Sequence, residues 1–141
     1  MNLVKHIMRF SGIRTATVGI VEKNGKVLLT KRSKLIADGG KWCLPGGHIK
    51  KWECAENTVK REVREEIGLE TIKSELLFVH EEFRKDLNLH AVVFVYKLNV
   101  KGSIKKNFEV SETRWFSKEE AKKLDMAFTH DEILERYWDG K

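Results

Sequence analysis

Residues Gly47 to Leu69 read GHIKKWECAENTVKREVREEIGL, and this stretch decides how the chain folds. On a helix that turns about 100° per residue, Glu62, Glu65 and Glu66 lie within a sector of roughly 100°. Three carboxylates on one face of a helix repel one another, and a divalent cation would relieve that repulsion. The stretch therefore predicts a helix whose acidic face lines a cleft. For a bare pair of glutamates, an acidic face exposed to solvent is the ordinary alternative.

The same stretch also predicts how the helix packs and where it ends. Val59, Val63 and Ile67 form an apolar stripe beside the acidic face, so they can dock the helix on a core. Gly68 follows the last turn, where a glycine commonly ends a helix. Before the helix, the segment 44–47 contains two adjacent glycines, which allow a tight turn and bring the backbone close to a ligand.

Every fixed position of this stretch matches one pattern: a glycine, five residues, Glu, seven residues, and then Arg-Glu-apolar-x-Glu-Glu-x-Gly-apolar. A given window matches it by chance with a probability on the order of 10⁻⁹. The pattern is the signature of the Nudix hydrolases, and the chain resembles that family from about Thr15 to Trp138. The resemblance implies an α/β fold, an α/β/α sandwich around a mixed β-sheet. It also implies a metal-dependent enzyme in which water attacks a diphosphate linked to a further group, usually a nucleoside.

The resemblance assigns roles to several residues of the signature. The cation would be Mg²⁺ or Mn²⁺, because hard cations prefer oxygen ligands. Its ligands would be the backbone carbonyl of Gly46 and the carboxylates of Glu62, Glu65 and Glu66. Glu53 and Arg61 would form an ion pair that orients the catalytic glutamate. On a continuous helix these two side chains point about 80° apart, so the pair requires a non-helical start to the segment.

A further acidic residue is expected outside the signature. Many family members place one on the loop before a late strand that carries a tryptophan, where it acts as a metal ligand or general base. Here that loop spans 105–112, and Glu109 is the first candidate because it stands six residues before Trp115. Glu112 is the second candidate, and Glu65 of the helix is an alternative base. A glutamate that simply faces solvent is an equally good interpretation of Glu109.

Candidate substrate contacts surround the glycine turn. Arg32 ends an expected strand and could hold a phosphate with two hydrogen bonds, or form an ordinary surface ion pair. Trp42, Phe83 and Phe128 could stack on a base, although aromatic residues beside strands more often belong to the core. Gly47 would bring the backbone close to the substrate.

The rest of the chain shows alternating strand and helix patterns. The expected strands span 15–22, 27–31, 72–82, 89–98 and 113–117, and the expected later helices span 118–124 and 130–138. Asn24-Gly25 predicts a two-residue hairpin turn. Ser117 with Glu120 predicts a capping box at the start of one helix. Thr129 with Glu132 predicts another at the start of the last helix.

Length and composition favour a single domain over residues 1–141. No apolar run reaches the ~18 residues of a membrane helix, and residues 1–10 mix charged with apolar side chains. We therefore expect no membrane span and no signal peptide, and place the protein in the cytoplasm. In a reducing cytosol, Cys43 and Cys54 are expected to be packing residues rather than a disulfide. Residues 1–14 suggest no function.

The net charge of +6 suits an anionic ligand such as a nucleotide. The basic residues are dispersed among acidic ones rather than gathered into a stripe, so we expect no stable complex with nucleic acid. The sequence does not determine the oligomeric state and leaves a homodimer open.

The substrate is the least determined part of the prediction. The ADP-ribose hydrolases of the family tend to carry a proline some fifteen residues after the signature, and the dinucleoside polyphosphate hydrolases a tyrosine, whereas this chain has Lys85 and Asp86 there. The run LPGGHI looks more like the MutT-type nucleoside triphosphate pyrophosphohydrolases, which release a monophosphate and pyrophosphate. We expect a nucleoside triphosphate first, and ADP-ribose or a nucleotide sugar second. A catalytically silent nucleotide-binding domain is the alternative of another class, and the intact glutamate cluster argues against it.

Overall fold

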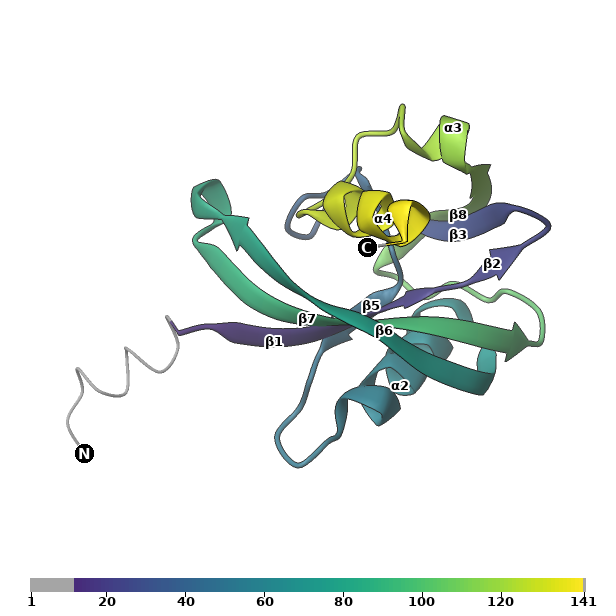
Figure 1. Ribbon diagram of the computed structural model, residues 1–141, viewed down its shortest axis with the longest axis horizontal. Coiled ribbons are helices and arrows are strands. Elements are labelled where there is room, and N and C mark those ends of the chain that lie inside the picture. Colours follow the sequence, from purple (N-terminus) through teal and green to yellow (C-terminus); the bar gives the residue numbers. More distant parts are fainter. Residues whose placement is uncertain (1–11, 141) are drawn as a thin grey trace.

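Two β-sheets form the framework of the protein, and the computed structural model describes residues 12–140. The first sheet has the strand order β5–β1–β7–β6 (Figure 1). Its strands are β1 (Arg14–Ile20), β5 (Gly46–His48), β6 (Glu70–Arg84) and β7 (Leu89–Lys101). Because β1 and β7 are parallel while the other pairs are antiparallel, the sheet is mixed.

The second sheet is built around β3, which pairs antiparallel with three other strands. Its strands are β2 (Glu22–Lys23), β3 (Lys26–Arg32), β4 (Trp42–Cys43) and β8 (Val110–Ser117). The predicted hairpin turn joins β2 to β3, and Asn24 and Gly25 both have positive φ angles, 52° and 76°. Such angles belong to the tight turns that match the twist of a hairpin. The chain thus passes from the first sheet to the second at Val21, between β1 and β2.

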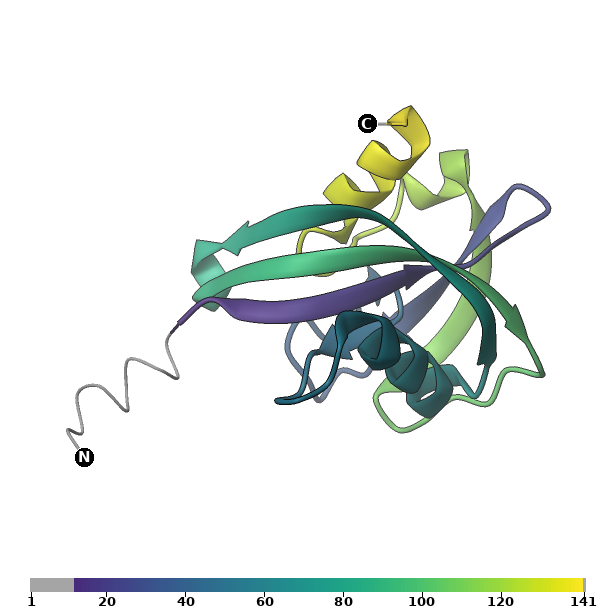
Figure 2. The same ribbon diagram turned by 60° about the horizontal axis from the view of Figure 1, so that its bottom comes forward.

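Helices lie on both sides of the first sheet (Figures 1 and 2). They are α2 (Ala55–Ile67), the short α3 (Lys118–Ala121) and α4 (His130–Asp139), with a 3₁₀ turn η1 (Lys85–Leu87) between β6 and β7. The helix α2 covers one face of the sheet, and α4 lies over the opposite face. The architecture is the predicted α/β arrangement of a mixed sheet with helices on either side.

The apolar stripe of α2 anchors the helix to the first sheet, as predicted. Val59, Val63 and Ile67 are fully buried and pack with Tyr96 and Leu98 of β7. Each such side chain contributes roughly 1.5–3 kcal/mol through burial. The helix ends where Gly68, at φ 72°, closes the last turn by donating its backbone N–H to the carbonyl of Arg64. Burial on this face leaves the acidic face of α2 turned toward the glycine strand β5.

One predicted helix cap is present and the other is wrong. Ser117 and Glu120 form the expected capping box at the start of α3. Thr129 makes no side-chain cap at the start of α4, because its hydroxyl and backbone N–H both donate to the buried carboxylate of Glu82, over 2.8 and 3.0 Å. The distant carboxylate of Glu82 thus takes the place of the helix backbone as the partner of the Thr129 side chain.

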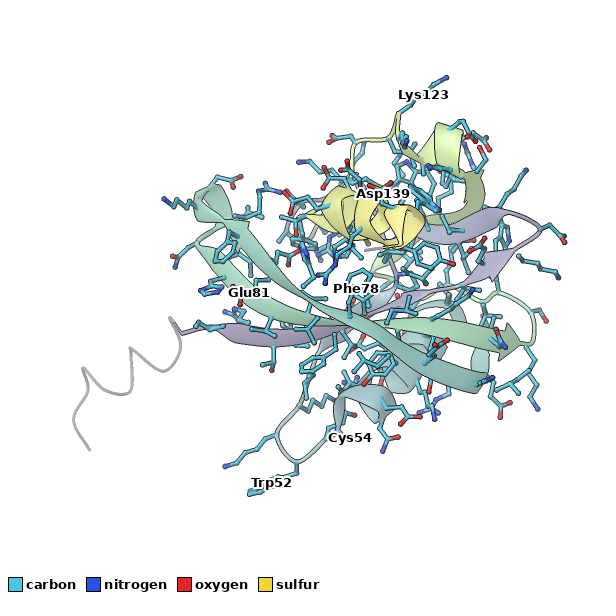
Figure 3. The ribbon with its side chains drawn as sticks, in the orientation of Figure 1. Trp52, Cys54, Phe78, Glu81, Lys123 and Asp139 are labelled. Carbon is cyan, nitrogen blue, oxygen red and sulfur yellow. The ribbon has the colours of Figure 1, made fainter. Side chains whose placement is uncertain are left out.

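The two cysteines are both free thiols. Cys43 is buried in β4, whereas Cys54 is exposed and projects with Trp52 from the segment between β5 and α2 (Figure 3). No helix within residues 12–140 is both long and apolar enough to cross a membrane. Of residues 1–14, for which the sequence suggests no function, residues 1–11 lie outside the described residues, and Arg14 begins β1.

Candidate active site

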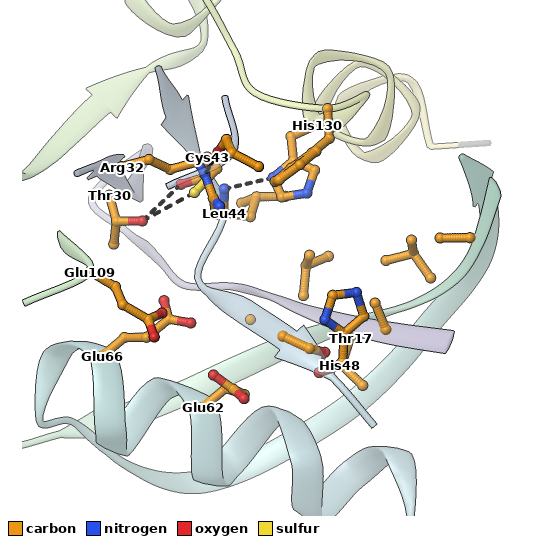
Figure 4. Close-up of a pocket in the computed structure, with 18 of the residues that line it drawn as sticks. Thr17, Thr30, Arg32, Cys43, Leu44, His48, Glu62, Glu66, Glu109 and His130 are labelled. Atoms are coloured by element: carbon orange, nitrogen blue, oxygen red, sulfur yellow. Dashed lines mark hydrogen bonds between the residues drawn. The ribbon is translucent and has the colours of Figure 1, made fainter. Parts of the chain in front are cut away.

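A cavity of about 580 Å³ is lined by residues of both sheets, of α2 and of the start of α4. Figure 4 shows carboxylates beside α2 and the ring of His130 across the cavity from them. We call the first group the acidic end, which consists of Glu62, Glu65, Glu66 and Glu109. We call the second group the far end, which consists of Glu82, Phe128 and His130.

Arg61 connects the carboxylates around the start of α2. Its Nε and Nη2 donate to the two carboxylate oxygens of Glu53 over 2.7 and 3.0 Å, which is a bidentate ion pair. Its Nη1 donates to Glu62 and Glu65 over 2.9 and 3.1 Å. Glu53 can reach the guanidinium because it precedes the helix, which begins at Ala55. The expected pair is therefore present, and it has the expected non-helical start.

Hydrogen bonds from Arg61 and from the hydroxyl of Thr58 lower the pKa of Glu53 to about 2. Glu53 is therefore a fixed anion at every physiological pH. A fixed anion holds Arg61 in place, and Arg61 in turn orients the carboxylates of Glu62 and Glu65.

Glu66 is the carboxylate that Arg61 does not neutralise. Its residue is only 7% exposed, and burial, together with the neighbouring Glu62, raises its pKa well above the ordinary value. Glu109 acts in the same direction, and hydrogen bonding with the backbone of Gly46 opposes it. Figure 4 shows the carboxylates of Glu66 and Glu109 close together beside α2. Within residues 12–140, neither of these two glutamates forms an ion pair.

The three helical glutamates thus have different surroundings. The side chain of Glu65 is 50% exposed and bound to Arg61, whereas Glu62 and Glu66 face the glycine strand. Across residues 12–140, no group of three or more His, Cys, Asp or Glu side chains is already arranged as a metal site. What the helix offers is two inward carboxylates, with Glu109 added from the loop before β8.

The glycines of β5 create the space that these carboxylates occupy. A Cβ atom at Gly47 would lie 2.6 and 2.8 Å from the two oxygens of Glu62, and one at Gly46 would collide with the backbone carbonyl of Thr17. Gly47 and Gly46 pair with Thr17 and Val18 of β1, so they cannot move away without breaking the sheet. Only glycine lets the strand and the helix approach this closely.

We predict that Gly47→Ala lowers kcat by about 100-fold, since a displacement of about 1 Å at a catalytic group can cost that much. The added methyl group must push the carboxylate of Glu62 out of its place, while most of the fold stays intact. Steady-state kinetics should be compared with thermal unfolding of the same preparation. A folded variant with the kcat of the natural protein would refute this role of Gly47.

Arg32 lines the cavity and contacts the far end through Phe128. It ends β3, where the register with β8 shifts and Arg32 pairs with Val110, one residue after Glu109. Its Nε donates to the carbonyl of Ala37 over 2.7 Å, and its guanidinium lies 4.7 Å from the centre of the Phe128 ring. These contacts direct the guanidinium along the cavity wall, where its remaining N–H groups can meet an anion.

A clasp of Asp38 and Arg84 holds the loops around the far end. The carboxylate of Asp38 accepts a hydrogen bond from the backbone N–H of Phe128 over 2.8 Å and from Arg84 over 3.1 Å. Arg84 also donates to the carbonyl of Phe128 over 3.1 Å. The β3–β4 loop, the end of β6 and the segment before α4 are thereby joined, and the ring of Phe128 is fixed against Arg32.

Burial raises the pKa of Asp38, but the hydrogen bond from Phe128 and the charges of Arg84 and Lys41 outweigh it and lower the pKa below the ordinary value of 3.8. A carboxyl with a lowered pKa stabilises the folded state above its unfolded pKa, and this contribution disappears as the pH falls through the folded pKa. The clasp is therefore complete at neutral pH and opens in acid.

We predict that Asp38→Asn lowers the free energy of unfolding by about 1–3 kcal/mol at neutral pH, because a hydrogen-bonded charge with a side chain only 7% exposed is removed. The difference from the natural protein should disappear at a pH below the lowered folded pKa. Urea unfolding at both pH values measures it. Asp86→Asn is the matched control, since Asp86 binds the same guanidinium but its side chain is 63% exposed, and its effect should be much smaller.

Two of the expected substrate contacts do not face the cavity. Trp42 is 8% exposed and packs edge-on against Phe116, with ring centres 4.9 Å apart, so it belongs to the core, as the alternative interpretation expected, and not to the cavity wall. Phe83 is 58% exposed and stacks on His90. Because side chains alternate along β6, Phe83 faces away from the cavity that the next residue inward, Glu82, lines. Of the three aromatic candidates, Phe128 lines the cavity.

The far end contains two residues that sequence reasoning did not assign to the site. The sequence places Glu82 only within an expected strand, and His130 only at the start of an expected helix. A signal for Glu82 exists, since one residue of the pair Glu81-Glu82 must point inward in a half-buried strand. His130 carries no such signal, because the start of α4 is placed at the cavity by tertiary packing.

Comparison with known proteins agrees with this geometry. The family model described as NUDIX domain matches residues 13–137. The chain belongs to the Nudix family. A protein named ADP-ribose pyrophosphatase from Methanocaldococcus jannaschii is 36% identical over 123 residues, which cover 86% of this chain and 71% of that protein. A CTP pyrophosphohydrolase from Escherichia coli is 34% identical over 74 residues, which cover 51% of this chain and 55% of that protein.

Solved structures agree in fold. A MutT NUDIX hydrolase from Burkholderia pseudomallei matches with a TM-score of 0.80 and 26% identity, over 88% of this chain and 97% of that one. The NUDIX domain of Shewanella oneidensis NrtR complexed with ADP ribose matches with a TM-score of 0.78 over 99% and 98% of the two chains, and its 22% identity shows the fold alone. The predicted Nudix fold is confirmed, and the chain is a hydrolase that acts on pyrophosphate bonds.

Proposed function

We propose that the cavity is the active site for metal-dependent hydrolysis of a diphosphate linked to a nucleoside. One observation carries the proposal: Glu62 and Glu66 of α2 meet Glu109 of a distant loop at one end of a cavity, beside a strand of glycines. A structural ion-pair network would surround such carboxylates with cations. Within residues 12–140, the cation that forms ion pairs with the acidic face of α2 is Arg61, which binds Glu53, Glu62 and Glu65.

The residues of the acidic end fit a hard divalent cation, Mg²⁺ or Mn²⁺. Glu66 is nearly buried beside other carboxylates, and this environment raises its pKa. A bound cation would offset the repulsion between these carboxylates and favour the charged form of Glu66. The groups that would hold the cation are the carbonyl of Gly46 and the carboxylates of Glu62, Glu65 and Glu66, with Glu109 as a further ligand or the base. When bound, the cation would neutralise diphosphate charge and acidify a water molecule.

Side chains of the protein would then orient the carboxylates, accept the proton and bind the phosphate. The pair of Glu53 and Arg61 fixes the orientation of Glu62 and Glu65. Glu65, half exposed at the mouth of the cavity, and Glu109, from the opposite loop, are the two candidates to accept a proton from the attacking water. Arg32 lies where it can hold a phosphate oxygen between the two ends.

We predict that Glu109→Ala lowers kcat by about 100-fold or more, whereas Glu112→Ala changes it little. Glu109 lines the cavity and faces Glu66, while Glu112 is bound to Arg114 outside it. The two substitutions lie on the same segment and remove the same group, so each controls for the other. Removal of a positioned general base typically costs 10² to 10⁴. Small and equal losses would return the base role to Glu65.

Two substrate classes remain to be separated. The run LPGGHI and the lack of a proline after the signature favour a nucleoside triphosphate, cleaved to a monophosphate and pyrophosphate. The relative that covers 86% of this chain is named an ADP-ribose pyrophosphatase, which favours ADP-ribose or a nucleotide sugar as the second candidate. Both classes place a diphosphate at the acidic end and a nucleoside farther along the cavity.

The test is a panel of nucleoside triphosphates, ADP-ribose and a nucleotide sugar with Mg²⁺ or Mn²⁺, with products identified by chromatography. Glu65→Gln should lower kcat by about 100-fold or more while thermal unfolding stays unchanged, because it alters a half-exposed side chain. Hydrolysis that survives in this variant would sink the proposed mechanism. A kcat/KM for ADP-ribose well above that for every triphosphate would make ADP-ribose the substrate.

Arg32→Ala separates binding from chemistry in the same panel. A contact to a phosphate that is not attacked contributes equally in ground and transition states, so its loss should raise KM and leave kcat nearly unchanged. The increase should be larger for a triphosphate than for ADP-ribose, because a triphosphate has the additional phosphate charge. A fall in kcat at constant KM would contradict this role.

A further inference from the structure

The far end of the cavity holds two polar side chains that the hydrolytic chemistry does not need. His130 is 6% exposed and Glu82 is 4% exposed, yet both line the cavity. Burying a polar group costs free energy unless it finds a partner, so each atom of these groups must be accounted for.

The hydrogen bonds of His130 fix where its proton lies. The backbone N–H of Leu44 donates to Nδ1 of His130 over 3.0 Å, as the dashed line in Figure 4 shows. Nδ1 is therefore an acceptor without a proton, and a neutral ring must carry its proton on Nε2. Burial lowers the pKa of His130 to about 4, which keeps the ring neutral. His130 thus presents a fixed donor, Nε2–H.

The carboxylate of Glu82 is fixed in a similar way. Its Oε2 accepts the hydroxyl and the backbone N–H of Thr129, over 2.8 and 3.0 Å. Within residues 12–140 no hydrogen bond is made by Oε1 of Glu82 or by Nε2 of His130. In that range, Thr71 Oγ1 is the one side-chain polar atom that is shut off from solvent without a partner. Oε1 of Glu82 and Nε2 of His130 are therefore not shut off from solvent, and a ligand in the cavity that both residues line can contact them.

An aromatic surface stands beside this donor and acceptor. The ring of Phe128, against which the guanidinium of Arg32 packs, lies 5.5 Å from the ring of His130, and the clasp of Asp38 and Arg84 fixes its backbone. A flat apolar ring next to one donor and one acceptor matches a nucleobase, which has a stacking face and an edge that carries donors and acceptors. Ribose and phosphate have no such face.

We propose that Nε2–H of His130 and Oε1 of Glu82, beside the ring of Phe128, read the edge of the substrate's nucleobase and determine which base the enzyme accepts. The inference rests on the proposed function in that it assigns the nucleoside to this cavity. It adds the two side chains that select the base. Leu44 is a positioning residue in this scheme, because it fixes the tautomer of His130.

Equilibrium binding to the full chain tests the inference without any turnover. The affinities of AMP, CMP, GMP, UMP and ribose 5-phosphate should be measured by calorimetry, since ribose 5-phosphate is the same ligand without a base. At least one nucleoside monophosphate should bind about tenfold or more tightly than ribose 5-phosphate, as two hydrogen bonds and a stacked ring allow. If no monophosphate exceeds ribose 5-phosphate, the inference is overturned.

His130→Asn separates recognition from structure. The asparagine oxygen can still accept the N–H of Leu44, but the shorter side chain cannot place a donor where Nε2 lies. We expect a loss of about tenfold in the affinity of the preferred monophosphate, with unchanged thermal unfolding and unchanged binding of ribose 5-phosphate. Natural affinity for every monophosphate would mean that His130 only supports α4, and would overturn the inference.

Glu82→Gln provides a second variant with a different readout. The amide oxygen would accept the N–H of Thr129, which turns an amide donor toward the cavity in place of an acceptor. The order of affinity among the four monophosphates should then change, whereas a mere loss of packing would weaken all four equally and count against the inference. If the protein prefers one nucleobase but hydrolyses no substrate of the panel, the inference about base recognition stands and the proposed function is rejected. If it hydrolyses a substrate but binds all four monophosphates equally, the proposed function stands and the inference is rejected.

Discussion

The guanidinium of Arg61 is the interaction on which the acidic end depends. Three carboxylates, those of Glu53, Glu62 and Glu65, accept hydrogen bonds from it over 2.7 to 3.1 Å. Glu53 precedes α2, so the same contacts also fix how the chain enters the helix. Without this cation the carboxylates would repel one another within a partly buried site, where charges interact more strongly than in water. One arginine therefore makes the cluster compatible with the fold, and it leaves Glu66 uncompensated.

That imbalance separates the charges that stabilise the fold from those that would serve the proposed chemistry. Arg61 forms a bidentate ion pair with Glu53 and also binds Glu65 at the surface, where the helix could tolerate a carboxylate in any case. Glu66 carries the remaining cost, because burial and the neighbouring carboxylates of Glu62 and Glu109 oppose its charged form. Such a free-energy cost is typical of sites that bind cations, because the bound cation, which also contacts the substrate phosphates, offsets the repulsion between the carboxylates.

The sequence predicted the helix α2 that carries the carboxylates better than it predicted the far end of the cavity, for a physical reason. The acidic face, the buried stripe and the final Gly68 of α2 follow from helical spacing within one continuous segment. The position of Trp42 in the core and the bond between Thr129 and Glu82 depend on contacts between distant segments, and local patterns at Thr129 predicted a cap that the tertiary partner displaced. The base-facing His130 has no local signal at all, since its role arises from a backbone N–H that lies 86 residues away.

The segment from Leu44 to Gly47 connects the far end of the cavity to its acidic end. At its start, the N–H of Leu44 orients His130 at the far end. At its other terminus, the missing side chain of Gly47 leaves room for the carboxylate of Glu62 at the acidic end. The strand β5, which begins at Gly46, is held in register with β1. Four consecutive backbone units therefore fix the separation between the group that would read a base and the groups that would hold its diphosphate. Because this separation is fixed by the backbone, substitutions at the far end of the cavity would change which base is accepted without displacing the carboxylates at the acidic end. A short chain can thus combine a hydrolytic site with a selective base pocket.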